Sequence, residues 1–590
     1  MSNIMNMKDV KNHVHRSGFD NSRRVCFTAK IGEILPLDWM PVLPGDDITI
    51  NLNSFGRTAP LQTASFARVR EYYDVYFVPY RLLWNQFNDW IKQTDAKSIA
   101  KSLISPSDDF ETMPYFTSTD LKNYYSFLDS DGAALYDDAM MLQKDSSKRL
   151  LRYLGYESYI STDEYPKPNQ ALSPFPLLAY QKIYQDFYRF SQWEDTAPWT
   201  CNLDYINTSS QLHLSIGSLF SPGNMNQKNL FRMQYCNYDK DYFNGLLPNA
   251  QYGDESIVSL TGEIPAGGYF NLGTLSFNLR PNDSSPMGSL NLNNATPTTG
   301  NPYPRVGYSG SSIQKGSLEG VAAENFGSSA LDSGIVSSFS VLALRRAECL
   351  QKWKEITMSG DTDYTSQLAK HWNVSVPKTL SQRCQYLGGT ASNLDISEVI
   401  NTNLTDGASA DIFGKGVISN NGHIKFTNPS NDYGIIMVMY HCKPIVEWKS
   451  SSVRARSLTA VHKTDFPIPE FDSIGMEQVF LHEFYNQSSA ALYTSQVAGY
   501  APRYIDYKTS FDIVKGEFED SLESWCLPYD LDRYFTVTGV GYVDYRAFKV
   551  TPTIADNLFG VSARQADQFY NSLYLDIKSV RNLSRDGLPY

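Results

Sequence analysis

The segment 71–91, EYYDVYFVPYRLLWNQFNDWI, constrains the fold more than any other part of the chain. Its first half reads as a strand with apolar or aromatic side chains on both faces: Tyr73, Val75 and Phe77 on one, and Tyr72, Tyr76 and Val78 on the other. A strand of this kind needs cover on both faces, so it belongs inside a β-sandwich or at an interface. We therefore expect core or interface positions at Tyr72, Tyr73, Val75, Tyr76, Phe77 and Trp84.

The second half of the same segment predicts a helix. Leu83, Phe87, Trp90 and Ile91 follow the spacing of one helix face. Pro79 stands just before the first turn, where the missing backbone N–H of proline costs nothing.

Strand patterns recur on both sides of this segment. In ITINLNSF (48–55) the apolar residues Ile48, Ile50 and Leu52 alternate with polar ones, which predicts a half-buried strand. After residue 370 the strand-like segments are IKFTN, GIIMVMYHCKPIVEW, RYIDYKTSF, YFTVTG and YRAFKVTP. The fold class predicted from these patterns is mostly β.

Two helical stripes stand out among the strands. The first lies in LLAYQKIYQDFYRF and the second in SSFSVLALRRAECLQKWKEI, which should stop near Gly360. Their apolar stripes are Leu177, Tyr180, Tyr184 and Phe187, and Phe339, Leu342, Ala343, Ala347, Leu350 and Trp353, respectively.

The chain has 590 residues but no run that reads as a linker between domains, and no repeat of solenoid length. We predict a single elaborated domain over 1–590. Two stretches interrupt the strand patterns and are interpreted as insertions. The first, 105–165, is rich in Asp and Tyr, and the second, 249–335, is dense in Gly, Ser, Asn, Thr and Pro.

Composition limits the classes of function. Charged residues make up 19% of the chain and aromatic residues 13%, with 39 Tyr, a balance typical of proteins whose surface becomes interface. The formal net charge of −12 argues against a surface that binds nucleic acid everywhere, because phosphates need clustered Lys and Arg. The net charge does not exclude a local basic patch that binds nucleic acid.

Cysteine usage and hydropathy indicate an intracellular setting. The seven cysteines contain no CxxC pair, so we expect buried, reduced thiols in a protein made in a reducing cytoplasm. The first 16 residues, MSNIMNMKDVKNHVHR, lack the apolar core of a signal peptide. The longest uncharged apolar run, around 434–440, is too short to span a bilayer. We expect neither export by that route nor membrane insertion.

Motif tests for an enzyme fail. HEFYN at His482 and Glu483 opens like a zinc-binding HExxH motif, but Asn486 replaces the second histidine. FGKG around Lys415 lacks the spacing of a phosphate loop, and no GxSxG elbow is present. His13 is the only histidine close to another, His15, and the pair is better explained as solvated or DNA-facing than as a metal site. We expect no enzyme activity, no metal and no cofactor.

Three small basic groups are candidates for contact with DNA. They are Arg16, Arg23 and Arg24; Arg454 and Arg456; and Lys578, Arg581 and Arg585. For any one group taken alone, a solvated surface paired with nearby acids is a better explanation than DNA contact. Many copies facing the inside of a shell would favour DNA contact, because a few phosphates neutralised per copy add up.

Several segments, in order, resemble one family. They are HRSGFDNSRR, GEILPLDWMPVLPGDD, FGRTAPL, VYFVPYRLLWNQF, FPLLAYQKIYQDFYR, NYDKDYFNGLLPNAQYGD, LALRRAECLQKW, HWNVSVPKTLSQRCQYLGGT, DFPIPEFDSIGMEQVF, AGYAPRYIDYK and LSRDGLP. Together they resemble the major capsid protein of microviruses, small icosahedral single-stranded DNA phages, in the branch related to gokushoviruses and associated with Bacteroidetes-type hosts. Each segment is modest alone, but the ordered set spans nearly the whole chain.

The resemblance implies an eight-stranded jelly roll, a β-sandwich with long insertions and a few helices. In that fold Tyr73, Val75 and Phe77 would face the core, whereas Tyr72, Tyr76 and Val78 would pack under an insertion or against a neighbouring subunit. By position, 249–335 resembles the outward protrusion linked to host attachment.

The resemblance also implies the partners of the chain. These are other copies of itself in pentamers and a sixty-copy T=1 shell, packaged circular single-stranded DNA, scaffolding, DNA-pilot and small DNA-binding virion proteins, and a host receptor, with a glycan among the options. The expected location is the virion, assembled in the bacterial cytoplasm.

Two other classes of function compete with a shell subunit. A carbohydrate-binding surface protein would use Tyr and Trp to stack on sugars, but a signal peptide would be expected with it. A glycoside hydrolase would need two carboxyl groups facing each other across the substrate, and no such pair is identifiable in the sequence.

Overall fold

The computed structural model covers residues 1–590, and the structure is described for 15–63, 65–92, 112–129, 143–161, 167–206, 212–215, 230–256, 276–279, 288–292, 306–309, 341–377, 381–400, 412–428, 432–449, 454–484, 496–529 and 543–585. The chain divides into two compact units, Met1–Tyr252 with Lys354–Tyr590, and Gly253–Trp353. The first unit contains all of the large sheets.

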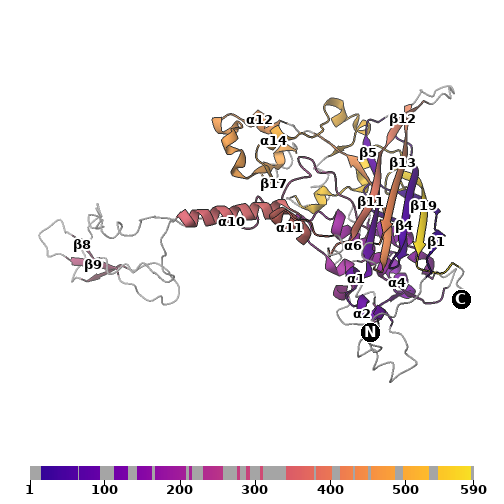
Figure 1. The fold of residues 1–590 in the computed structure, drawn as a ribbon. Coiled ribbons are helices and arrows are strands. Elements are labelled where there is room, and N and C mark those ends of the chain that lie inside the picture. Colours follow the sequence, from indigo (N-terminus) through magenta and orange to yellow (C-terminus); the bar gives the residue numbers. More distant parts are fainter. Residues whose placement is uncertain are drawn as a thin grey trace, which may run out of the picture. The chain divides into compact units, whose positions relative to one another are not determined.

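One large sheet, called the β4 sheet below, is built from strands far apart in the sequence (Figure 1). Its four central strands lie in the order β2 (Arg23–Ala29), β19 (Phe569–Arg581), β4 (Asp47–Thr58) and β13 (Ile412–Thr427). Two further strands, β1 (Ser17–Asp20) and β12 (Asp395–Ile400), pair with β19 and β13.

The second large sheet, the β5 sheet, contains four strands in the order β3 (Leu35–Val42), β14 (Gly434–Ile445), β5 (Arg68–Pro79) and β11 (Gln385–Asn393). All of its pairs are antiparallel.

The strand order of the two sheets is that of a jelly roll. Along the chain the eight strands run β2, β3, β4, β5, β11, β13, β14, β19. The first pairs with the last, the second with the seventh, the third with the sixth and the fourth with the fifth, all antiparallel. This nesting is what results when one long hairpin of strand pairs wraps into a two-sheet sandwich, so the predicted fold class is confirmed.

The core lies between the two sheets and is rich in rings. Phe77 of β5 meets Phe426 of β13 with 5.1 Å between ring centroids, and Phe27 of β2 meets Tyr440 of β14 at 4.9 Å. Strand β4 alternates buried and exposed positions from Ile48 onward, as its sequence pattern predicts. These contacts join the sheets through side chains in the way expected of packed sandwiches.

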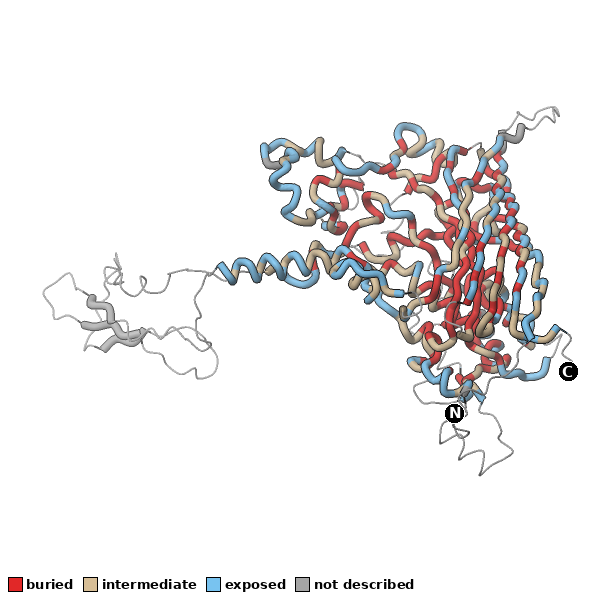
Figure 2. Tube along the Cα trace, in the orientation of Figure 1, coloured by how far each residue is buried: buried red, intermediate tan, exposed pale blue. Residues whose placement is uncertain are grey.

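The outer face of the β5 sheet is covered by helices. Helix α6 (Phe175–Ile183) and the π turn η4 (Tyr184–Tyr188) lie over β5 and β14, and eight of the nine residues of α6 are buried. Helix α5 (Gln143–Tyr153) packs against β3. Figure 2 shows the resulting burial along this part of the chain in red.

The prediction of a single helix after Pro79 is wrong. The structure has two short helices, α1 (Tyr80–Leu83) and α2 (Phe87–Lys92), separated by Trp84 in an extended conformation. The Asn85 N–H donates to Asp204 Oδ2 at 2.9 Å instead of continuing the helix. Trp84 is 7% exposed, so the break places its indole in the core.

The strand predictions for two further segments are also wrong. RYIDYKTSF forms the short helix α14 (Ile505–Lys508), and YRAFKVTP begins with the 3₁₀ turn η11 (Tyr545–Phe548). In the second case the Asp544 side chain accepts a hydrogen bond from the Arg546 N–H at 2.8 Å, which caps a helical turn. YFTVTG lies outside the described residues.

The two predicted helical stripes are confirmed as helices, the first as α6 with η4 and the second as α10 (Val341–Ser359). Phe339 lies outside the described residues. None of the residues of α10 is buried, although a buried stripe is the usual reason for such a pattern.

The remaining elements are short. The helices are α4 (Ser118–Asp129), α7 (Pro198–Cys201), α8 (Leu203–Ile206), α11 (Tyr364–Trp372) and α12 (Ala455–Thr459), and the 3₁₀ turns are η3 (Tyr156–Tyr159), η5 (Lys463–Asp465), η6 (Pro469–Ile474), η7 (Leu481–Glu483), η9 (Gly516–Glu519), η10 (Glu523–Trp525) and η12 (Pro552–Ala555). The strands are β6 (Phe116–Thr117), β7 (Ala171–Leu172), β15 (Glu447–Trp448), β16 (Met476–Phe480), β17 (Val497–Pro502) and β18 (Pro528–Tyr529). The second unit contains a three-stranded antiparallel sheet of β8 (Ser276–Leu279), β9 (Gly288–Leu292) and β10 (Val306–Ser309).

The insertions predicted at 105–165 and 249–335 are only partly described. Helices α4 and α5 belong to the first, and the sheet of β8, β9 and β10 belongs to the second. Within the described part of the chain, none of the helices combines the length and the apolar character needed to cross a bilayer.

The prediction that the cysteines are buried is wrong for two of the seven. Cys26 on β2 and Cys349 on α10 are exposed, whereas the other five are buried, and all seven are free thiols. Cys26 occupies an outward position of the β4 sheet, on the same face of β2 as the polar Arg24 and Thr28.

Candidate functional site

The structure brings two of the three predicted basic groups onto one sheet. Strand β1 and strand β2 both pair with β19, so the groups near the two ends of the chain become neighbours. In this register Arg24 lies opposite Tyr574, and Ser17 lies opposite Arg581. The third group, Arg454 and Arg456, lies on and beside α12, outside this sheet.

Most of the cations in these two groups already have partners. Lys578 Nζ pairs with Asp20 at 2.5 Å and Asp576 at 3.3 Å, and its hydrogen bond to Asp20 raises the pKa of the lysine. Arg23 binds Asp38 at 2.5 Å. Arg24 donates to the Ser572 hydroxyl at 2.8 Å, and Arg581 lies 3.5 Å from Asp46 and donates to the Pro41 carbonyl. The last two cations, Arg16 and Arg585, are exposed.

The third basic group is part of a structural network. Arg456 Nε donates to Glu483 Oε2 at 3.2 Å, and Arg456 also pairs with Glu477. Tyr242 donates to the same Glu483 oxygen at 2.7 Å. Arg454 donates to the backbone carbonyl of Asp506. The glutamate of the HEFYN motif is therefore a buried anchor that holds an arginine and a tyrosine.

The predicted core and interface residues lie around β5. Tyr73, Val75, Tyr76, Phe77 and Trp84 are buried within this one chain. The Tyr76 ring lies 4.9 Å from that of Phe187, and its hydroxyl donates to Tyr188 at 3.1 Å. Tyr72 is half-buried and stacks on His441, with 4.7 Å between ring centroids.

A carboxyl group is buried between the two sheets beside these rings. Glu71 Oε1 accepts from Tyr440 at 2.6 Å and from Asn571 of β19 at 2.7 Å, so one residue ties the sheets together. Burial raises the pKa of Glu71 above its ordinary value, against the effect of these hydrogen bonds. On the opposite face of the sheet, burial lowers the pKa of His441 well below its ordinary value.

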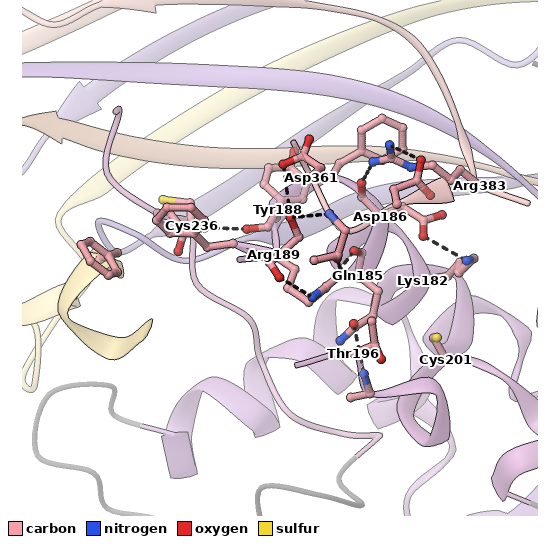
Figure 3. A pocket seen from close by; sticks show the side chains of 18 of the residues that line it. Lys182, Gln185, Asp186, Tyr188, Arg189, Thr196, Cys201, Cys236, Asp361 and Arg383 are labelled. Atoms are coloured by element: carbon pink, nitrogen blue, oxygen red, sulfur yellow. Dashed lines mark hydrogen bonds and ion pairs between the residues drawn. The ribbon is translucent and has the colours of Figure 1, made fainter. Parts of the chain in front are cut away.

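A cavity of about 740 Å³ opens beside η4 (Figure 3). Lys182 on its wall pairs with Asp186 at 2.9 Å, and Arg383 pairs with Asp363 at 3.3 Å. The Asp186 carboxylate also accepts from the Cys384 N–H at 2.8 Å. These charges neutralise each other, and their hydrogen bonds connect the π turn to the start of β11. We therefore interpret the wall of the cavity as a structural contact and assign no ligand to it.

Sequence reasoning missed the exposed aromatic residues of the β4 sheet. Phe55 on β4 is 45% exposed, and Tyr570 and Tyr574 on β19 are 44% and 45% exposed. All three stand at outward positions of neighbouring strands, because Ser572, midway between the tyrosines, lies opposite Phe55. The signal was the alternation of β4, which predicts Asn51 and Asn53 on the solvent side and continues to Phe55.

Two arginines accompany these rings. The Arg57 guanidinium lies 5.5 Å from the centroid of the Phe55 ring, and Arg57 stands opposite Tyr570. Arg24 stands opposite Tyr574 and donates from Nε to Ser572 at 2.8 Å. Among the described residues, the ion pairs include no carboxylate partner for either arginine.

Candidate metal ligands do not converge in the described part of the chain. His15 is exposed there, and His13 lies outside it. The described residues contain no group of three or more His, Cys, Asp or Glu side chains placed to hold a metal ion.

Comparison with known families decides the class of the protein. The family model described as capsid protein (F protein) matches residues 8–123 and 152–587. The chain belongs to the capsid protein (F protein) family. The stretch that the match leaves out, 124–151, falls inside the insertion predicted at 105–165.

Two curated relatives agree with this assignment. The chain is 23% identical over 566 residues to capsid protein VP1 of Chlamydia phage 1, covering 87% of each chain. It is 23% identical over 541 residues to capsid protein VP1 of Bdellovibrio phage phiMH2K, covering 89% of this chain and 86% of the relative. The resemblance to microvirus capsid proteins is confirmed, and the role of the chain is that of a structural capsid protein.

Proposed function

We propose that sixty copies of this capsid protein form a closed T=1 icosahedral shell around circular single-stranded DNA. The observation that carries the proposal is the family match, which spans nearly the whole chain. The complete jelly roll supports it, because a closed two-sheet sandwich gives a rigid wall element whose long connections are free to contact neighbours.

The proposal includes the partners of the shell. Pentamers would be the assembly intermediate, and scaffolding, DNA-pilot and small DNA-binding virion proteins would act with them. The shell would assemble in the bacterial cytoplasm and end in the virion. Its role would be structural, with no catalysed reaction and no cofactor.

Particle mass tests the shell. The chain, co-expressed with the other genes of its genome, should form isometric particles in negative-stain microscopy. Sixty chains of 66.6 kDa should give roughly 4 MDa of protein by mass photometry, before the mass of DNA is added. A chain that stays monomeric under all conditions of co-expression would contradict the proposal.

A second experiment tests host attachment by the insertion at 249–335. Deletion of 260–330 should leave particle assembly largely intact and abolish adsorption to the host, because an external loop contributes to attachment rather than to the sandwich. Normal adsorption by the deleted particles, or failure to form any particle, would count against this role. Competition with cell-surface glycans would then identify the receptor class.

A further inference from the structure

The outward face of the β4 sheet differs from a typical solvated sheet. Three successive rows cross β2, β19, β4 and β13 in register, and their outward residues are Thr28, Tyr570, Arg57 and Val417; Cys26, Ser572, Phe55 and Ser419; and Arg24, Tyr574, Asn53 and Asn421. We call these residues the ring patch. Its members are exposed or half-buried, although aromatic side chains gain from burial.

The three rings of the ring patch are spaced as a row of platforms. Tyr570 and Tyr574 are each two residues from Ser572 on β19, and Phe55 stands directly opposite that serine. Phe55 is therefore a diagonal neighbour of both tyrosines, at about 7–8 Å between backbone positions. Adjacent nucleotides of an extended single strand can reach successive platforms at this separation.

The charge of the ring patch complements a polyanion. Its residues include Arg24 and Arg57 but no Asp or Glu, in a chain whose formal net charge is −12. At one end the carboxylates of the same face begin one row further along β19, at Asp576, which already pairs with Lys578. At the other end Asp567 accepts a hydrogen bond from Thr28, and its charge is neutralised by Arg149. The absence of acids in the ring patch matters because a phosphate backbone would be repelled by them.

We propose that the ring patch binds single-stranded DNA, with bases stacked on Phe55, Tyr570 and Tyr574 and phosphates held by Arg24 and Arg57. This inference rests on the proposed function and names the surface that meets the packaged strand. Stacking platforms combined with a cationic groove hold single strands without sequence preference, because every base has a π face. Four-stranded sheets with exposed aromatic residues bind unpaired nucleotides in the same manner.

The pairing of rings with arginines favours DNA over the other occupants of an apolar face. A second copy of this acidic chain would gain from the arginines only where it presented carboxylates. A neutral sugar would use the rings and the asparagines but not the two cations. Single-stranded DNA uses both features at once, and the amide of Asn53 or Asn421 can hydrogen-bond to bases or phosphates.

Photochemical cross-linking in intact particles tests the contact. Particles grown with 5-bromouracil in place of thymine are irradiated, and nucleotide adducts on protein peptides are located by mass spectrometry. Adducts should concentrate on the peptides that carry Phe55, Tyr570 and Tyr574. DNA-containing particles with adducts only on residues outside the ring patch would overturn the proposal. Wild-type particles without DNA would instead overturn the proposed function.

Binding measurements separate stacking from charge. In titrations of the full chain with oligo-dT, the triple variant Phe55→Thr, Tyr570→Thr and Tyr574→Thr should weaken binding about a thousandfold, because each of the three stacked rings contributes about tenfold. The slope of affinity against salt should stay unchanged in that variant. Arg24→Gln and Arg57→Gln should each reduce the slope by about 0.7.

The matched control is Tyr159→Thr, because Tyr159 on η3 is 44% exposed but lies outside the β4 sheet. Threonine keeps the strand propensity of the replaced positions, so the variants should fold. Circular dichroism and the denaturation midpoint check this before binding is compared. A folded triple variant that binds oligo-dT as tightly as the wild type and the control would contradict the proposal.

Discussion

The two sheets of the sandwich share a core but have opposite outer faces. The β5 sheet is covered by α5, α6 and η4, so Tyr76 is 4% exposed and touches Phe187 and Tyr188. The β4 sheet has its rings exposed at outward positions, with Phe55 and Tyr574 each 45% exposed. Figure 2 shows buried and exposed positions alternating along strands such as β4 and β19.

The difference shows how one fold can combine a rigid, covered sheet with an exposed sheet that can bind a partner. Insertions between the strands of the β5 sheet turn its outer face into a second core, which stiffens the subunit. Within the described part of the chain, the three rings of the ring patch have no such cover, so they and the neighbouring arginines are available to a partner. Aromatic exposure on one face and aromatic burial on the other thus distinguish binding from packing.

The largest expected effect comes from placing a charge on the covered face. Tyr76→Asp should prevent folding or assembly, with a loss of more than about 4 kcal/mol of unfolding free energy, because it puts an unpaired carboxylate among buried rings. Yield of folded protein and the denaturation midpoint measure the loss.

The same change on the other sheet is the matched control. Tyr574→Asp should cost about 1 kcal/mol or less, because the carboxylate stays in water. Normal particle yield from Tyr76→Asp, or equal losses of unfolding free energy in the two variants, would contradict the proposed difference between the two outer faces.

A smaller effect is expected from removing rings without adding charge. Phe77→Ala should cost about 3–5 kcal/mol, because it leaves a cavity against Phe426 in the core. Phe55→Ala should cost less than about 1 kcal/mol in the folded chain and act on DNA binding instead. Chemical denaturation of both variants provides the comparison, and similar losses would show that Phe55 is part of a core.

The smallest effect is expected from the carboxyl that ties the sheets together. Burial raises the pKa of Glu71, so the folded chain favours the protonated form. The resulting stability is fully present below the unfolded pKa of about 4.3 and is lost as the pH rises through the higher folded pKa.

Glu71→Gln removes this titration. The stability advantage of the wild type over the variant should therefore be largest at acidic pH and shrink by roughly 1–3 kcal/mol towards neutral pH. Denaturation midpoints of both proteins across pH 4–8 measure the difference. A difference that grows with pH would mean that the ionised form is the one stabilised between the sheets.

The sequence predicts those features that depend on neighbouring residues. The alternation of β4 and the two apolar faces of β5 could be predicted because alternate side chains of a strand lie on the same face. The residue types on each face therefore indicate whether that face is buried. The ordered family segments predicted the jelly roll, which periodicity alone did not, because strand order is set by pairs such as β2 with β19 at opposite ends of the chain.

The features that escaped prediction depend on distant partners. The break at Trp84 follows from a hydrogen bond between Asn85 and Asp204, far along the chain. Lys578 is neutralised by Asp20 only because β1 pairs with β19, so its candidacy for DNA contact could not be weighed from the sequence. The ring patch likewise exists only in the register of four strands.

Electron cryomicroscopy of DNA-filled particles tests the central claim most directly, because it shows which sheet faces the interior and what lies against it. We predict that the β4 sheet lines the inner surface of a closed shell, with DNA density stacked on Phe55, Tyr570 and Tyr574. A shell in which that face points outward, or in which a neighbouring subunit covers the three rings, would contradict the account.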